Sequence, residues 1–95
     1  MRFVNRSNAS KRSYKLIKKR GKDIEKLHKV IFLLANDLPL TPAHKDHELS
    51  GKFSSFRELH IEPDWLLIYY KQNASIDYPE GVLFLELTGT HSDLF

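Results

Sequence analysis

Hydrophobic residues recur at steps of three and four along residues 24–38, which is the spacing of one face of an α-helix. The stripe consists of Ile24, Leu27, Val30 or Ile31, Leu34 and Leu38. Asp23 and Glu25 stand at its start, where the helix dipole favours acidic groups. Pro39 ends it, because the residue before a proline avoids helical geometry. The pattern predicts an amphipathic helix with one buried face.

A more polar helix is predicted before it. Residues 2–5 are expected to form a short first strand. Asn8 or Ser10 is expected to cap the following helix, which runs to about Arg20. Gly21 suits the end of that helix, so the two helices should form an antiparallel hairpin.

From residue 53 the period changes to the alternation of a β-strand. Phe56, Glu58 and His60 form one set of alternate positions. Arg57, Leu59 and Ile61 form the other. Glu58 and His60 are therefore expected to project from the same face. The preceding residues 39–52 contain prolines, a glycine and mixed polar residues, and they are predicted to be a loop.

Two further strands are predicted. Residues 62–64 form a turn that leads into the continuous apolar and aromatic run 65–70, which is typical of a central strand. A polar connection, 72–81, precedes a third strand, 82–88, which a glycine ends. Residues 91–95 are predicted to be a short tail.

This order of elements predicts an α+β fold in which an N-terminal helical hairpin packs on a small antiparallel β-sheet. With 95 residues the chain is expected to be a single domain, residues 1–95, with a modest core. The absence of cysteine excludes disulfides and thiolate–zinc sites. There is no apolar run of membrane-spanning length and no apolar leader segment, so we expect a cytoplasmic protein.

The net charge of +3 is unevenly distributed. Residues 1–30 hold 11 of the 15 lysines and arginines and two acidic residues, a net charge of +9. Residues 31–95 hold four basic and ten acidic residues, a net charge of −6. This asymmetry favours a polyanionic partner for the basic part. A solvated helix face without a partner explains it equally well.

Histidines are the candidate catalytic residues. Metal-free cleavage of RNA uses the ribose 2′-hydroxyl as nucleophile. It needs one group to take that proton, a second to protonate the leaving 5′-oxygen and a donor to stabilise the phosphate. Histidine suits both proton roles because it titrates near neutrality. Antiparallel pairing would bring His47, His60 and His91 to one end of the sheet, and we hypothesise that they converge there.

Three other candidates have competing interpretations. His44 and His47 are spaced as metal ligands would be on a helix, but they lie in a predicted loop and are better explained as polar surface. Trp65 and Phe95 would be able to stack a base of single-stranded RNA. Core packing is the favoured alternative for Trp65, and anchoring of the tail is an equal alternative for Phe95.

Three motifs follow one another in the second half of the chain. Segment 45–51 reads KDHELSG, segment 56–69 reads FRELHIEPDWLLIY and segment 88–95 reads TGTHSDLF. In order and spacing they resemble the K-D-H-x-L-x-G, R-[DE]-x-H-[VIL]-x-P-D-W-[IL]-L-[IV]-Y and G-[ST]-H-x-x-L-F motifs of YafQ-type toxins in the RelE/ParE superfamily. The resemblance covers roughly residues 40–95, and the N-terminal helices match only in pattern.

The resemblance implies a RelE-like toxin of a type II toxin–antitoxin pair. Such a toxin binds the ribosomal A site and cuts translated mRNA without a metal or other cofactor. The implied partners are a cognate antitoxin, the ribosome with its mRNA, and operator DNA only through the antitoxin complex; no membrane is implied. The basic first helix would then grip ribosomal RNA phosphates in salt-sensitive contacts, or dock an acidic antitoxin segment.

The resemblance also implies a set of site residues. By position, the family's active-site residues fall on His47, His60, Asp64, Trp65, His91 and Phe95. His91 is expected to be the general acid, and His60 or His47 the base or a phosphate binder. Asp64 is expected to orient a histidine or assist proton transfer. The expected substrate-binding residues are Glu58, Trp65, Phe95, Lys45, Lys52 and Arg57.

One position departs from the family pattern. Many relatives carry an arginine two residues before the glycine of the last motif, where this chain has Leu87. Losing one donor to the transition-state phosphate commonly costs a factor of about 10²–10³ in rate. Lys45, Lys52 or Arg57 substitutes for it, or ribosomal RNA supplies part of the environment, or the activity is weak. Arg57 has a structural alternative as part of a supporting ion pair within its strand.

Two other functions remain open at this point. The same fold would suit a ParE-like gyrase poison, because fold alone does not separate these activities. An inactive protein that only pairs with an antitoxin is favoured by Leu87. The three histidines favour the nuclease, since a binding module has no need for three proton carriers.

Overall fold

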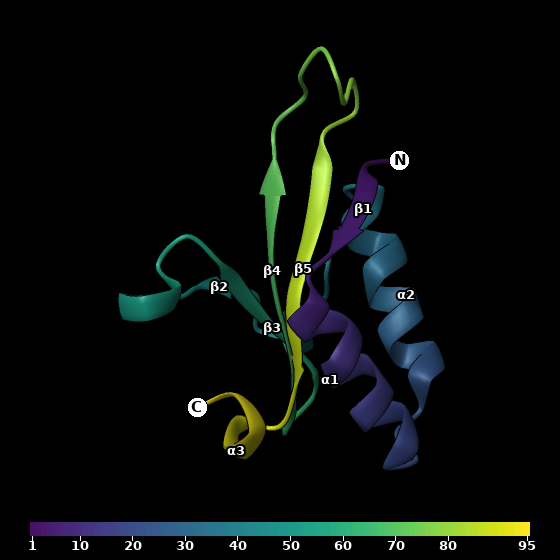
Figure 1. Ribbon diagram of the computed structural model, residues 1–95, viewed down its shortest axis with the longest axis vertical. Helices are drawn as coiled ribbons and strands as arrows, with labels where there is room; N and C mark the ends of the chain where they lie inside the picture. The colour runs from purple at the N-terminus through teal and green to yellow at the C-terminus, as the bar shows by residue number, and fades with distance from the viewer.

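The computed structural model describes residues 1–95, with the side chain of Lys52 outside the described residues. Its helices and strands are β1 Phe3–Arg6, α1 Asn8–Lys19, α2 Ile24–Ala35, β2 His47–Glu48, β3 Arg57–Glu62, β4 Trp65–Gln72, β5 Val82–Gly89 and α3 His91–Leu94. Short 3-10 turns occupy Pro42–His44 and Gly51–Phe53. The α1–α2 hairpin covers one face of the sheet, and α3 and the segment around β2 lie on the other side (Figure 1).

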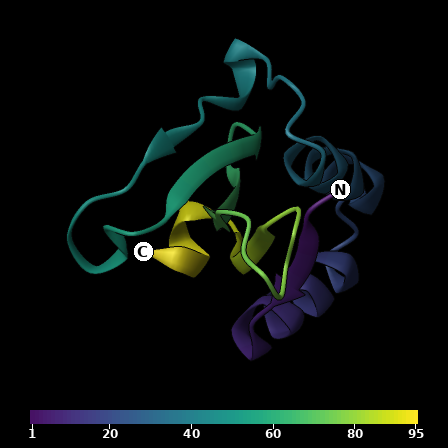
Figure 2. The same ribbon diagram turned by 90° about the horizontal axis from the view of Figure 1, so that it is seen from above.

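The sheet has the strand order β1-β5-β4-β3-β2. Strands β2 to β5 pair antiparallel, as predicted, but β1 runs parallel to β5. The α+β class and the helical hairpin are confirmed, whereas the fully antiparallel sheet was wrong at this edge. Parallel neighbours need a long crossover, and here the helical hairpin and the other strands lie between β1 and its partner in sequence. Figure 2 shows the hairpin beside β1 at this edge.

The N-cap of the first helix lies one residue before Asn8, the earlier of the two predicted caps. Ser7 is the N-cap, and its Oγ accepts the backbone N–H of Ser10 at 2.9 Å. The two predicted caps, Asn8 and Ser10, both lie within the helix, and Asn8 is its first residue. Gly21 follows the helix with a φ of +79°, a conformation that glycine adopts without the cost a side chain would impose.

The second helix ends at Ala35, before the predicted stop at Pro39. Asp37 adopts a left-handed φ of +54°. The backbone N–H groups of Asp37 and Leu38 then bond the carbonyls of Leu34 and Leu33 at 3.2 and 2.9 Å, which is a Schellman motif. An aspartate in place of the usual glycine hid this cap from the sequence pattern. Among the described residues, no helix has the length and apolar character needed to cross a membrane.

The core fills the space between the helical hairpin and the sheet. Its buried residues are Ile17, Leu27, Val30, Leu34, Ala35, Leu59, Trp65, Leu67, Tyr69, Leu83 and Leu85. Trp65 is 0% exposed, and its indole N–H donates to the Thr88 hydroxyl at 2.9 Å. That hydroxyl donates in turn to the Leu66 carbonyl at 2.8 Å. The prediction that Trp65 binds substrate was wrong, because a ring with no exposed face has none to offer a base.

We expect Thr88→Val to destabilise the protein by about 1–3 kcal/mol, because it leaves the buried Trp65 N–H without an acceptor. Thr88→Ser is the matched control, since it retains the hydroxyl and removes only a methyl group. Urea denaturation of both variants measures the difference in unfolding free energy. Equal losses in the two variants would show that the hydroxyl is not what holds Trp65.

Candidate active site

Strand register brings the histidines together on the sheet face opposite the helices. His47 of β2 pairs with Glu58 of β3. Glu58 and His60 flank Leu59, which is buried in the core, so both point to the other face. The ring centroid of His60 lies 6.5 Å from that of His47 and 5.8 Å from that of His91. The structure therefore places the three predicted histidines in one cluster.

Glu58 is the buried acid of this cluster. Its side chain is only 7% exposed, and its Oε1 lies 3.7 Å from His47 Nε2 and 3.4 Å from His60 Nε2. A positive charge on either ring therefore has a counter-charge within 4 Å. Glu58 therefore contacts the two imidazoles from the protein side. Its burial leaves little surface for the direct substrate contact that we predicted.

His91 is held by Asp64. Its Nδ1 lies 2.8 Å from Asp64 Oδ1, and its backbone N–H donates to the same oxygen at 3.2 Å. Both hydrogen bonds lower the pKa of the Asp64 carboxyl, and the one with the imidazole has the larger effect. An ionised carboxylate only accepts, so the Nδ1 of His91 carries a proton and its Nε2 is left for a substrate. Asp64 thus orients a histidine, one of its two predicted roles.

The other two rings are oriented by backbone carbonyls. His60 Nδ1 lies 3.2 Å from the Pro63 carbonyl, and His47 Nδ1 lies 2.6 Å from the Lys45 carbonyl. Carbonyl oxygens accept only, so each Nδ1 is the donor. Lys45 has a left-handed φ of +48°, which turns its carbonyl toward His47. Lys45 is exposed and lines a pocket with His60 and Pro63, beside the cluster.

Arg57 lies on the opposite face of β3 from the histidines. Its guanidinium donates to both oxygens of Asp46, at 3.2 and 3.1 Å. The hydroxyl of Tyr69 donates to the same carboxylate. Burial and this hydrogen bond raise the pKa of Tyr69 well above its usual value. The structure therefore corrects the substrate-binding role of Arg57: it forms the supporting ion pair, and fixes the residue that precedes His47.

His44 stays outside the cluster. Its Nδ1 accepts the backbone N–H of Thr41 at 3.2 Å and closes a capping box on its own turn. Asp46 is engaged by Arg57. The polar-loop interpretation of this segment therefore fits its contacts better than a metal site shared with His47.

Phe95 docks beside the cluster with much of its ring uncovered. Its ring meets Phe53 edge-on at 5.9 Å, and Phe53 meets Phe56 at 6.2 Å. The side chain of Phe95 is nevertheless 62% exposed. It anchors the end of the chain and still presents a ring face, so both roles considered for it fit the geometry.

Leu87 lies on the histidine face. Glu58 pairs with Ile68, and Ile68 pairs with Leu87, so the three form one row across the sheet. A side chain at position 87 therefore points to the same side as the cluster. The position that carries arginine in many relatives is thus at the site, and here it has no donor. The side chain of Lys52, a suggested substitute, lies outside the described residues.

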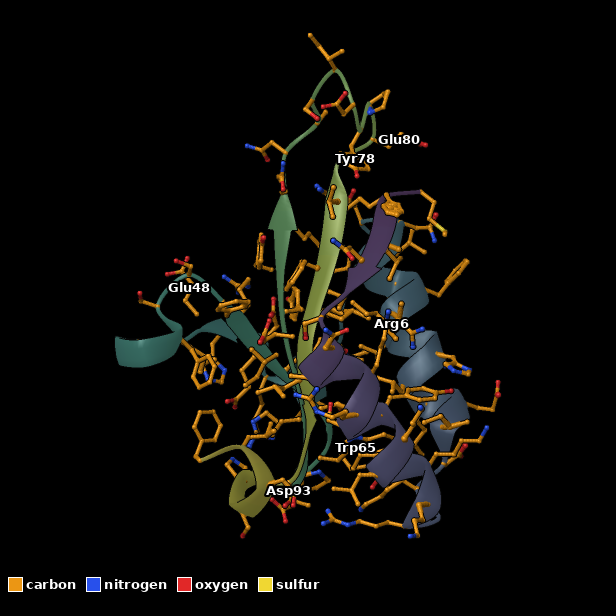
Figure 3. The ribbon with its side chains drawn as sticks, in the orientation of Figure 1. Arg6, Glu48, Trp65, Tyr78, Glu80 and Asp93 are labelled. Carbon is orange, nitrogen blue, oxygen red and sulfur yellow. The ribbon has the colours of Figure 1, made fainter. Side chains whose placement is uncertain are left out.

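The predicted tail is the helix α3. Its capping box joins Thr90 and Asp93: the Thr90 hydroxyl accepts the Asp93 N–H at 3.2 Å, and the Asp93 carboxylate accepts the Thr90 N–H at 2.9 Å. Asp93 was not predicted as a functional residue, although Thr-x-x-Asp has the spacing of a capping box. Figure 3 shows Asp93 at the end of the sheet near α3, and Trp65 between the sheet and the helices.

One further property follows from the cluster's geometry. Glu58, His60 and His91 each offer a ligand atom, and these three atoms lie within 4.8 Å of one another. A carboxylate with two imidazoles is a common donor set for transition metals. The same three side chains are thus suited to proton transfer or to holding a metal ion.

Comparisons with known proteins identify the family. Residues 2–95 match the family model described as bacterial toxin of type II toxin-antitoxin system, YafQ. The chain is 40% identical over 95 residues to the mRNA interferase toxin YafQ of Escherichia coli K12, covering 99% of this chain and 96% of that protein.

Two solved structures are similar over nearly the whole chain. The E. coli DinJ–YafQ toxin–antitoxin complex gives a TM-score of 0.84 at 40% identity, covering 99% of this chain and 97% of the other. A metal-bound toxin from Helicobacter pylori gives 0.87 at 39% identity, covering 100% of both chains. The resemblance drawn from the three motifs is confirmed: the chain belongs to the YafQ family of bacterial toxins of type II toxin–antitoxin systems.

Proposed function

We propose that this toxin is an endoribonuclease that cleaves translated mRNA on the ribosome by histidine acid–base catalysis without a metal. The convergence of His47, His60 and His91 over the buried Glu58 carries the proposal. The name of the E. coli relative, an mRNA interferase, supports the same activity.

The reaction needs one proton taken and one given. The ribose 2′-hydroxyl attacks phosphorus, the bond to the 5′-oxygen breaks, and the products are a 2′,3′-cyclic phosphate and a 5′-hydroxyl. His91 donates its Nε2 proton to the leaving oxygen, and the Asp64 carboxylate stabilises the imidazolium before that transfer. The residue that accepts the 2′-hydroxyl proton is His47 or His60.

Exposure favours His47 as the base. The side chains of His47 and His91 are 51% and 53% exposed, whereas that of His60 is 16% exposed. His60 is also held on both ring nitrogens, by the Pro63 carbonyl and Glu58. His60 therefore suits binding of the phosphate between the two exposed rings, with Lys45 beside it.

The partners follow from charge and from the relatives. The outer face of α1 carries exposed cations: Lys11, Arg12, Lys15, Lys18 and Lys19. We propose that these cations bind phosphates of ribosomal RNA. A toxin that acts on translating ribosomes in this way works in the cytoplasm. A cognate antitoxin is the second partner, as DinJ is for the E. coli toxin. Operator DNA is reached only through the antitoxin complex.

We expect His91→Ala to lower cleavage by a factor of about 10²–10⁴, the usual contribution of a general acid. Primer extension on a translated mRNA, after induction in cells, measures the cuts. His44→Ala is the control, because His44 caps its own turn outside the cluster, and it should cut normally. Undiminished cuts with His91→Ala would refute the assignment. Growth arrest by the wild type without new mRNA ends would favour the gyrase-poison alternative.

We expect Leu87→Arg to raise the cleavage rate by about tenfold or more, because it adds a charged donor on the histidine face. Leu87→Met is the control, since it keeps a similar volume without charge. Single-turnover cleavage on programmed ribosomes measures both. An inactive wild type with an active Leu87→Arg would identify a degenerate toxin. No gain in an active wild type would mean that Lys45 or ribosomal RNA already supplies the donor.

A bound metal should inhibit this site. Similar structures from H. pylori include a metal-bound toxin and a copper-bound L66S mutant toxin, and Glu58, His60 and His91 here have the spacing of a ligand set. A metal ion there would engage an imidazole nitrogen of His91, the proposed general acid. We expect EDTA to leave cleavage unchanged and copper(II) to inhibit it, with calorimetric copper binding weakened by His91→Ala and retained by His44→Ala. Loss of cleavage in EDTA would instead indicate a metal-dependent enzyme.

A further inference from the structure

An ion pair links the end of α1 to the helix that carries His91. The Arg20 guanidinium Nη1 lies 2.6 Å from Asp93 Oδ2. The same carboxylate accepts the Thr90 N–H in the capping box of α3. The hydrogen bond from Arg20, followed in size by the one from the Thr90 N–H, lowers the pKa of Asp93 to about 2. Asp93 is therefore ionised at neutral pH and fixed from two sides, and it fixes the first turn of α3, where His91 stands.

Contact with the end of β5 restricts α3 further. A Cβ placed on Gly89 would lie 3.0 Å from both the Cβ and an oxygen of Asp93. The carboxylate is thus packed against the backbone that leads into α3 as well as bonded to it. A shift of Asp93 would move the start of α3, and His91 with it.

A second group of ion pairs links the helical hairpin to the β3–β4 turn. The carboxylate of Glu62 accepts Lys26 at 2.8 Å and Lys22 at 3.3 Å. These contacts, Lys26 first, lower the pKa of Glu62. Glu62 ends β3 just after a register irregularity, and the next two residues are Pro63, whose carbonyl orients His60, and Asp64. The hairpin therefore also holds the turn that orients the catalytic histidines.

The two groups meet at the His91–Asp64 contact. This contact joins α3 to the β3–β4 turn, and its two side chains are 53% and 67% exposed. Each of the joined segments is attached to the helical hairpin by one of the ion-pair groups. Exposed ion pairs contribute little to stability, whereas a displacement of about 1 Å at a reacting group can cost about 10²-fold in rate. Their consequence is therefore expected in catalysis more than in folding.

We propose that Arg20 and Asp93 are positioning residues that hold His91 against Asp64, so that the hairpin of the basic N-terminal region sets the geometry of the general acid. The inference rests on the proposed function, in which His91 is that acid. Arg20 acts through Asp93 and α3, and it touches neither substrate nor the reacting atoms. Lys26 and Glu62 have the corresponding effect on Asp64.

The kinetic test compares two charge losses at adjacent positions. Arg20→Gln and Lys19→Gln each remove one exposed cation from the end of α1, and Lys19 forms no ion pair with the described residues. We expect Arg20→Gln to lower the single-turnover rate on programmed ribosomes at least tenfold, with a KM equal to that of Lys19→Gln. Arg20→Lys should recover most of the rate. Equal rates for Arg20→Gln and Lys19→Gln would overturn the proposal and leave Arg20 as one more RNA-binding charge.

A second readout needs no activity. Two-bond ¹H–¹⁵N spectra distinguish which nitrogen of His91 carries the proton. We expect Nδ1 to be protonated in the wild type and in Lys19→Gln, and the preference to weaken in Arg20→Gln while the thermal stabilities of the two variants agree. An unchanged His91 spectrum in Arg20→Gln would refute the positioning role, whatever the activity. Failure of the proposed function is seen separately, as cleavage that survives His91→Ala.

Discussion

The alternation along β3 is the constraint on which the site depends. Leu59 is fully buried in the core, and this burial fixes which face Glu58 and His60 present. A slip of one residue would bury both polar side chains among the apolar residues and expose Leu59. The core on one side of the sheet therefore specifies the chemistry on the other. His47 joins the same face only because β2 pairs in register with β3.

Carboxylates then hold His91 and the segments next to it, whereas backbone carbonyls orient His47 and His60. Asp64, Glu62 and Asp93 each have a pKa lowered by a basic or imidazole partner. A carboxyl group with a lowered folded-state pKa contributes stability above its unfolded pKa, and this contribution is lost as the pH falls through the folded value. For Asp93 that window lies below its ordinary value and reaches about pH 2. The network that orients His91 is thus fully ionised at the neutral pH at which an imidazole can exchange protons.

Sequence predicted what is periodic; it missed the local caps at Ser7, Asp37 and Asp93, and it failed where a distant partner decides. The stripe of α2 and the alternation of β3 follow from the spacing of residues alone. The parallel pairing of β1 with β5 leaves no such trace, since the strands are separated by most of the chain. Arg57 illustrates the same limit within the site: strand alternation offered an ion pair or a substrate contact, and only the position of Asp46 separates them. Convergence of the histidines was a hypothesis from antiparallel pairing, and spacing alone could not prove it, because it depends on which strands pair and in which register.

The fold divides the cations of the basic N-terminal region into an ion-paired group and an exposed group. Several cations of the first 30 residues are neutralised by acids of the remainder: Arg2 by Asp37, Arg20 by Asp93, and Lys22 and Lys26 by Glu62. Those along the outer face of α1 stay exposed. A polyanionic partner therefore suits only the exposed cations, whereas the paired cations have an internal structural role that neither sequence interpretation, polyanionic partner or solvated face, included. Because Arg20 bonds Asp93 while the unpaired cations of α1 face outward, the proposed positioning of His91 and the proposed grip on RNA use different cations of the same hairpin.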